Sequence, residues 1–110
     1  MASVKMMQGD SYSIPIDLYL DGQTLKPSMV KEVLVYVGSA LVKSFTKKEV
    51  GYDTTKQQWY IRPTQEETLA MEPGDYQVIA RVKFNGVNPD VEGVLTGRLI
   101  ITEGPGTEVL

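Results

Sequence analysis

Apolar and polar residues alternate over several short stretches of the chain. The clearest stretch is 75–84, in which Tyr76 and every second residue up to Phe84 are apolar and most residues between them are polar. Residues 11–20 alternate in the same way, with Pro15 at one of the polar positions. Because successive side chains of a β-strand point to opposite faces, both stretches predict half-buried strands. Proline cannot donate to a ladder, so the first of these strands is expected at a sheet edge or with a bulge.

Five further stretches have the composition of short strands, namely 33–37, 41–45, 50–52, 58–61 and 94–102. Gly38 and Ser39 break the run between the first two, and the second can pair back as the other arm of a hairpin. The third and fourth are expected to pair around a turn in the same manner. The last stretch is partly apolar on both alternating faces, which predicts a central or covered strand.

One short segment carries a helical pattern. Thr64 is followed three residues later by Glu67, which is the spacing of a capping box. The pattern ends at Glu72, Pro73 and Gly74. We therefore expect one or two helical turns near residues 64–70, acting as a connection between strands.

Together these elements predict an all-β fold, an immunoglobulin-like or fibronectin-III-like β-sandwich of about seven strands with one short helical turn. A five- or six-stranded barrel is the alternative architecture. Residues 1–103 are expected to form a single domain, in which 1–10 are an N-terminal arm or a first strand. Residues 104–110 predict an extended C-terminal tail. Trp59 shares a face with Ile61 and is expected in the core.

The charge and the missing residue types limit the chemistry. The 110 residues hold 14 acidic and 11 basic side chains, a net charge of −3, which disfavours nucleic-acid binding and a basic membrane-surface module. There is no cysteine and no histidine, so disulfides, zinc-thiolate sites, Ser-His-Asp triads and imidazole bases are excluded. No apolar run is long enough to span a bilayer. We expect no cofactor and no enzymatic activity.

The remaining charged groups do not form a convincing site. Glu66 and Glu67 are adjacent and diverge on a helix, so they are interpreted as solvated charges that compensate the helix dipole. A loose series of oxygen ligands lacks the length and the central glycine of a calcium loop: Asn88, Asp90 and Glu92. A small basic cluster is interpreted as an exposed strand face: Lys43, Lys47 and Lys48.

Exposed aromatic side chains and the two terminal segments are the best candidates for contacts with a partner. Three tyrosines are expected to point away from the apolar faces of their strands, where tyrosine is also simply a favourable strand residue. The terminal segments add methionines and aliphatic residues that could join a neighbouring sheet or groove. The candidate interface residues are Tyr19, Tyr36, Tyr60, Met6, Met7, Val109 and Leu110.

A local motif sharpens the expected fold. The run from Met71 to Tyr76, with Pro73 and Gly74 in its middle, resembles the start of strand F in fibronectin-III and related sandwiches. In those folds the hydroxyl of this tyrosine bonds to the backbone just upstream. The resemblance implies that Tyr76 is such a corner tyrosine.

A longer resemblance covers about residues 6–102. The chain is similar to the small immunoglobulin-like structural proteins of tailed bacteriophages and prophages of Gram-positive bacteria, including the N-terminal domain of baseplate upper proteins. The segments that carry this resemblance are 8–16, 50–53, Trp59, 64–69, 73–76 and 81–83.

This resemblance implies a non-enzymatic virion protein that is made in the host cytoplasm and acts by contacts with other phage structural proteins in a multimeric assembly. The N-terminus has no signal-peptide pattern, which agrees with that expectation. No fibre segment follows the domain in these 110 residues, so a capsid decoration, connector or tail accessory role is expected as readily as a baseplate role. A carbohydrate- or adhesin-type binding module is the alternative.

Overall fold

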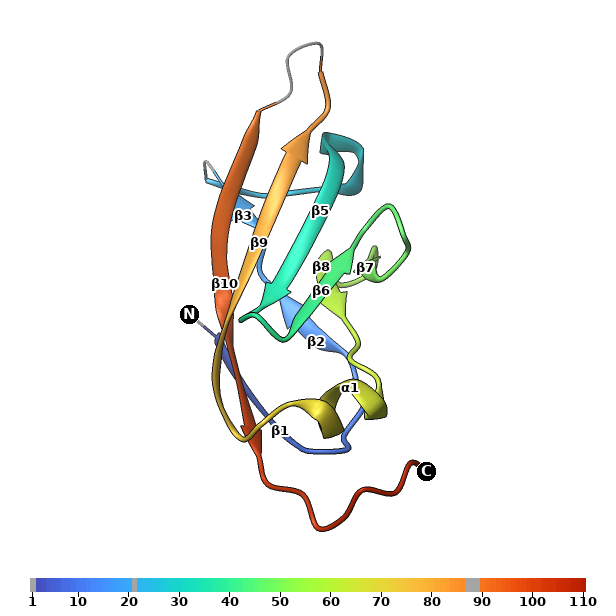
Figure 1. The fold of residues 1–110 in the computed structure, drawn as a ribbon. Helices are drawn as coiled ribbons and strands as arrows, with labels where there is room; N and C mark the ends of the chain where they lie inside the picture. Colours follow the sequence, from blue (N-terminus) through green and yellow to red (C-terminus); the bar gives the residue numbers. More distant parts are fainter. Residues whose placement is uncertain (1, 21, 87–89) are drawn as a thin grey trace.

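The structure is a computed structural model that describes residues 2–20, 22–86 and 90–110. These residues form two main sheets, with strand orders β1-β10-β9-β5-β6 and β2-β8-β7, and a small β3-β4 hairpin (Figure 1). The elements of the described chain are β1 (Ala2–Met7), β2 (Ile14–Ile16), β3 (Tyr19–Leu20), β4 (Gln23–Thr24), η1 (Pro27–Met29), β5 (Val30–Val37), β6 (Leu41–Ser44), β7 (Val50–Asp53), β8 (Gln58–Ile61), α1 (Gln65–Ala70), β9 (Gly74–Phe84) and β10 (Val91–Thr102).

The predicted all-β sandwich is therefore confirmed. The pairing β10-β9-β5-β6 in one sheet and β2-β8-β7 in the other is the strand arrangement of immunoglobulin-like domains. The expected hairpins β5-β6 and β7-β8 are both present, β10 is a central strand, and β2 with Pro15 lies at a sheet edge. The strand number is higher than expected because the 11–20 stretch divides into β2 and β3, and because β1 and β4 are additional strands.

The N-terminal segment is a strand and not a free arm. β1 pairs in parallel with β10, with Val4 opposite Leu99 and Met6 opposite Ile101. Parallel pairing joins residues that are almost the whole chain apart, so no local pattern could have predicted it. Met6 is consequently buried in the core, with 1 % of its surface exposed.

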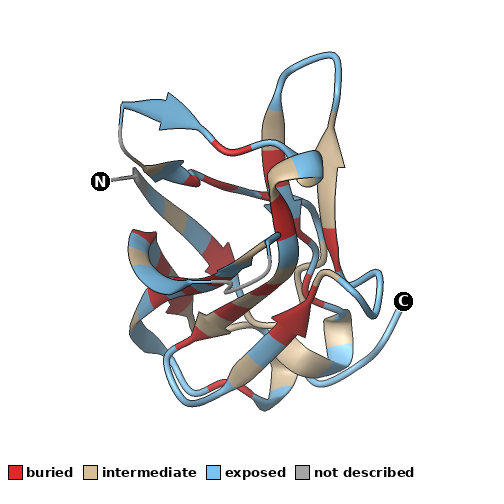
Figure 2. Cartoon of the chain, turned by 90° about the horizontal axis from the view of Figure 1, so that it is seen from above, coloured by how far each residue is buried: buried red, intermediate tan, exposed pale blue. Residues whose placement is uncertain are grey.

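The hydrophobic core lies between the two main sheets (Figure 2). On β5 the inward residues Val33, Val35 and Val37 are fully buried, as the alternation predicts. Trp59 on β8 fills the centre of the core. Its Nε1 donates to the carbonyl of Leu25 at 2.8 Å, so its single polar atom is satisfied.

The alternation on β10 is interrupted by a β-bulge. Leu95 is opposite Ile79 and Gly97 is opposite Val78, so Thr96 has no partner position on β9. The Thr96 hydroxyl instead donates to the carbonyl of Val78 at 3.1 Å. A bulge moves the residues before it to the other face of the sheet. Uninterrupted alternation over 94–102 predicts Leu95 on the same face as Leu99, and this is wrong, because the bulge turns Leu95 outward.

The connection from β8 to β9 has the predicted local structure. Thr64 Oγ1 accepts a hydrogen bond from the Glu67 amide at 3.1 Å, and the Glu67 carboxylate accepts one from the Thr64 amide at 2.8 Å. This is a capping box, and α1 then runs for six residues. The Tyr76 hydroxyl donates to the carbonyl of Glu72 at 2.6 Å, which is the tyrosine-corner geometry that the resemblance implies.

Residues 104–110 have no regular secondary structure, and their path leads back along α1 (Figure 1). The amide of Gly104 donates to Gln8 Oε1 at 3.1 Å, and the amide of Leu110 donates to Gln65 Oε1 at 2.9 Å. The expected extended tail is thus lightly attached to the domain. Within the described ranges, no helix has the length and apolar character needed to cross a membrane.

Candidate functional site

The outer face of the five-stranded sheet carries a row of apolar side chains. Tyr36 on β5 is directly opposite Val42 on β6 and Ile79 on β9, and Ile79 is opposite Leu95 on β10. Directly opposite residues in antiparallel strands point to the same face. The four side chains therefore form one line across four strands, which we call the apolar row: Val42, Tyr36, Ile79 and Leu95.

Water is in contact with most of this row. Val42, Ile79 and Leu95 are 52, 37 and 45 % exposed, and Tyr36 is half-buried. Isolated apolar residues are common on protein surfaces, but a contiguous line of four is characteristic of a contact surface. Tyr36 was predicted as an interface candidate, and the structure places it within this line.

One side of the apolar row carries two basic residues and one acidic residue. Arg81 is opposite Leu34, and Lys83 is opposite both Val91 and Glu32. These residues and Tyr36 surround a shallow hollow of about 170 Å³. Burial by itself would raise the pKa of Glu32, but hydrogen bonds from the hydroxyls of Thr46 and Ser44 and from two backbone amides lower it below its usual value.

The other side of the row is mixed in charge. Gln77 and Asp75 lie two and four residues before Ile79 on β9, and Arg98 and Ile100 are opposite them on β10. The Arg98 guanidinium forms an ion pair with the Asp75 carboxylate, and both side chains are partly exposed. Charged residues of both signs thus border the apolar row on both sides.

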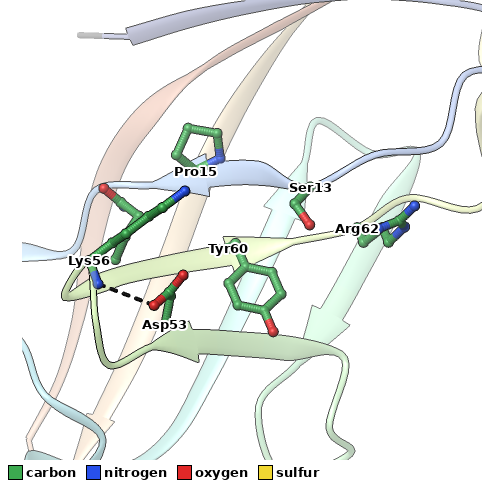
Figure 3. A pocket seen from close by; sticks show the side chains of 7 residues that line it. Ser13, Pro15, Asp53, Lys56, Tyr60 and Arg62 are labelled. Carbon is green, nitrogen blue, oxygen red and sulfur yellow. Dashed lines mark hydrogen bonds between the residues drawn. The ribbon is translucent and has the colours of Figure 1, made fainter.

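A second surface lies on the opposite side of the molecule, on the outer face of β2-β8-β7. It is a groove of about 760 Å³ around Tyr60, and we call it the Tyr60 groove (Figure 3). Lys56 and Arg62 lie toward its two ends, with Tyr60 between them. The residues that line it are Ser13, Pro15, Asp53, Lys56, Gln58, Tyr60 and Arg62.

The position of the Tyr60 ring is explained by a glycine on the adjacent strand. Gly51 on β7 is directly opposite Tyr60. The ring lies over Gly51 so closely that a Cβ atom there would overlap with Cζ, Oη and Cε1 of the ring. A ring that covers a strand glycine in this way is held against the sheet and presents its other face to solvent.

The other interface candidates do not join either surface. Tyr19 on β3 is 60 % exposed and lines a separate hollow of about 340 Å³. Met7 and Leu110 line a common hollow of about 270 Å³ beside α1. Val109, the residue before Leu110, is exposed. Met6 is buried, so the expectation that its side chain is available to a partner is wrong.

The expected basic cluster is also not formed. Lys43 is opposite Val35 on the inner side of its sheet and is 7 % exposed, whereas Lys47 and Lys48 are exposed. Lys43 Nζ donates to both carboxylate oxygens of Glu67, at 2.7 and 2.8 Å.

Glu67 is correspondingly half-buried and paired with Lys43, whereas Glu66 beside it is exposed, and both acidic residues lie in the first turn of α1. Burial alone would raise the pKa of Glu67, but the hydrogen bonds from Lys43 and from the Thr64 amide, together with the Lys43 charge, lower that pKa below its usual value. The hydrogen bonds and the Lys43 charge all stabilise the ionised carboxylate that caps α1.

The described residues contain no group of three or more acidic side chains that could hold a metal ion together. The loose calcium-like series was Asn88, Asp90 and Glu92, of which Asn88 lies outside the described residues and the other two are exposed. The chain matches no protein-family model, no curated protein and no solved structure.

Sequence reasoning missed most of the apolar row. Ile79 is the one apolar residue among the outward positions 75, 77, 79, 81 and 83, and this exception was a usable signal. Leu95 carried no such signal, because only the bulge at Thr96 turns it outward. Val42 gains its importance from its position opposite Tyr36, which only the strand register reveals.

Proposed function

We propose that this chain is a non-enzymatic structural protein of the virion of a tailed phage or prophage, which acts through protein–protein contacts in a multimeric assembly. The role is capsid decoration, connection or tail and baseplate accessory. The resemblance of residues 6–102 to small immunoglobulin-like phage proteins supports this proposal. The tyrosine corner at Tyr76, which fibronectin-III and related sandwiches share, agrees with the immunoglobulin-like fold of those proteins.

The observation that carries the proposal is the apolar row. Its four side chains cross the sheet in one line, and charged and polar residues border it on either side. An apolar centre with a polar rim is the organisation of protein–protein interfaces. The row lies on hydrogen-bonded strands of one sheet, so its geometry is fixed before a partner arrives.

The test is to co-express the chain with the structural proteins encoded beside it, and to purify the assemblies. The proposal expects co-purification with capsid, tail or baseplate proteins and symmetric density for the domain in electron micrographs. Ile79→Glu should abolish co-purification, because it places a charge in the centre of the row. Tyr60→Glu is the matched control, since Tyr60 is 36 % and Ile79 37 % exposed and the two lie on different sheets. Equal retention of both variants would contradict the proposal.

A carbohydrate- or adhesin-type binding module is the second candidate, and the Tyr60 groove favours it. A flat aromatic ring between Lys56, Arg62, Gln58 and Asp53 combines an apolar platform with hydrogen-bonding groups, as ligand grooves do. A glycan array probed with the wild-type chain and with Tyr60→Ala tests it. Binding of a saccharide that the variant loses would favour this candidate, and an array without binding would reject it.

A further inference from the structure

We propose that the partner of the apolar row is a second copy of this chain, which packs face to face across a twofold axis that runs along the row. This inference rests on the proposed function, because it names a contact of the assembling domain. A twofold axis in the plane between the sheets, perpendicular to the strands, places each row residue over its own counterpart. Sheets packed in this way lie about 10 Å apart, with interdigitating side chains.

Complementary charge on β9 is the first support. The outward residues of β9 are arranged around Ile79, with Asp75 four residues before it and Lys83 four residues after it. An axis through Ile79 reverses this order in the second copy. Lys83 of each chain then faces Asp75 of the other, and Arg81 faces Gln77. Opposite charges placed across an interface fix its register.

Complementary shape on β10 is the second support. On β5, Leu34 lies two residues before Tyr36, and the strand ends at Val37, so the same axis sets Leu34 over the turn that follows β5 in the second copy. On β10, Gly93 is two residues before Leu95, and the space above Gly93 is open. Arg98 of the second copy would face that space. The bulge at Thr96 makes Arg98, opposite Gln77, the next outward residue after Leu95 on β10.

The outermost pair of facing residues on β10 is apolar. Val91, which is 50 % exposed, would face the half-buried Ile100 of the second chain. Arg98 therefore meets the open space at Gly93, opposite charges meet each other, and apolar residues meet apolar residues under one symmetry operation. The pattern matches its own copy with the residue order along each strand reversed, and a second copy of this chain supplies that reversed pattern.

The size of the surface sets the expected affinity. Four strands at about 4.8 Å spacing and eight residues at about 3.4 Å give a planar footprint of about 500 Å², which is at the low end for specific interfaces. Weak self-association is therefore expected, and it should be measured from about 10 μM to about 1 mM. In a particle that holds many copies, the high effective concentration would favour the contact.

The test is sedimentation equilibrium of the full chain. The wild type should approach twice its single-chain mass of 12.2 kDa as concentration rises. Lys83→Asp and Asp75→Lys should each weaken association by about tenfold or more, because each creates two like-charge pairs in a dimer. An equimolar mixture of the two variants should associate at wild-type strength, since every Lys83→Asp chain then faces an Asp75→Lys chain. Circular dichroism of each variant checks that it is folded.

The mixing result is specific to this geometry. A dimer that neither single variant weakens, or that the mixture fails to restore, would overturn the proposed axis. If either charge variant does not fold, Ile79→Glu replaces it, with dissociation expected and Tyr60→Glu as the control that stays dimeric. A wild type that remains a monomer at about 1 mM would overturn the inference and leave the row to a different protein. Co-purification of that monomer with virion proteins would still support the proposed function.

Discussion

The carboxylate of Glu67 connects α1 to the edge of the five-stranded sheet through Lys43. It accepts two hydrogen bonds from the Lys43 ammonium, at 2.7 and 2.8 Å, and one from the Thr64 amide at 2.8 Å. The Lys43 side chain is 9 % exposed, so its charge has little access to water. One side chain thus serves the helix cap and neutralises a buried cation, and this explains why the short helix is held in place.

Replacement of Glu67 by glutamine should destabilise the fold by about 1–3 kcal/mol, because it leaves the Lys43 ammonium buried without a counter-charge. Urea unfolding followed by tryptophan fluorescence measures the change, since Trp59 is buried in the core. Glu66→Gln is the matched control on the same helix, and it should alter the free energy of unfolding by less than about 0.5 kcal/mol. Equal effects of the two substitutions would contradict the role of the ion pair.

The depressed pKa values of Glu67 and Glu32 predict a loss of stability in acid. Both folded-state values lie below the usual 4.5, so the unfolded chain binds more protons than the folded chain as the pH falls. The stabilisation is complete above pH 4.5 and is lost as the pH falls through the folded-state pKa of each group. Free energies of unfolding measured across this window should fall with pH. The Glu32→Gln, Glu67→Gln double variant should show a shallower fall, and an unchanged slope would contradict the assignment.

The alternation of residues predicted the strands and their inner faces because burial between two sheets acts with the same period of two. It could not predict Lys43, whose register opposite Val35 turns it inward although lysine is usually exposed. It also failed for Met6 and Leu95. Their positions depend on a parallel pairing over almost the whole chain and on a single bulged residue, and neither leaves a local pattern.

The candidate surfaces were predictable only in part, for the same reason. Tyr36 and Tyr60 were identified as outward residues, and this placement is correct. Their neighbours on adjacent strands were not identified, because a surface is assembled across the sheet by strand register. Ile79 beside Tyr36 and Gly51 beside Tyr60 are the residues that give each surface its character.

Substitution of Tyr76 by phenylalanine should destabilise the domain by about 0.5–1.5 kcal/mol. It removes the hydrogen bond of 2.6 Å to the Glu72 carbonyl and leaves the ring in place. The control is Tyr19→Phe, since Tyr19 is 60 % exposed. Chemical denaturation of both variants decides the matter, and a Tyr76→Phe chain as stable as the control would show that the corner contributes nothing to stability.

Removal of residues 104–110 should leave the fold intact. This segment has no regular structure, and its amide hydrogen bonds to Gln8 and Gln65 are at the surface of the domain. The free energy of unfolding should change by less than about 1 kcal/mol. Removal of residues 2–7 is the contrasting variant, because it deletes β1 and takes Met6 out of the core, and that chain should not fold. A tail deletion that unfolds the domain would contradict this prediction.

Gly51→Ala should have opposite effects in two backgrounds. In the wild type the new methyl group overlaps with the Tyr60 ring, so the ring must move and the fold should lose about 1 kcal/mol. In a Tyr60→Ser background the space is free, and alanine should stabilise the strand by about 0.5 kcal/mol, since glycine is unfavourable in a strand interior. Urea unfolding of the four chains completes a double-mutant cycle with a coupling energy of about 1.5 kcal/mol. If Gly51→Ala changes stability by the same amount in both backgrounds, Gly51 does not position the ring, and the Tyr60 groove loses its fixed platform.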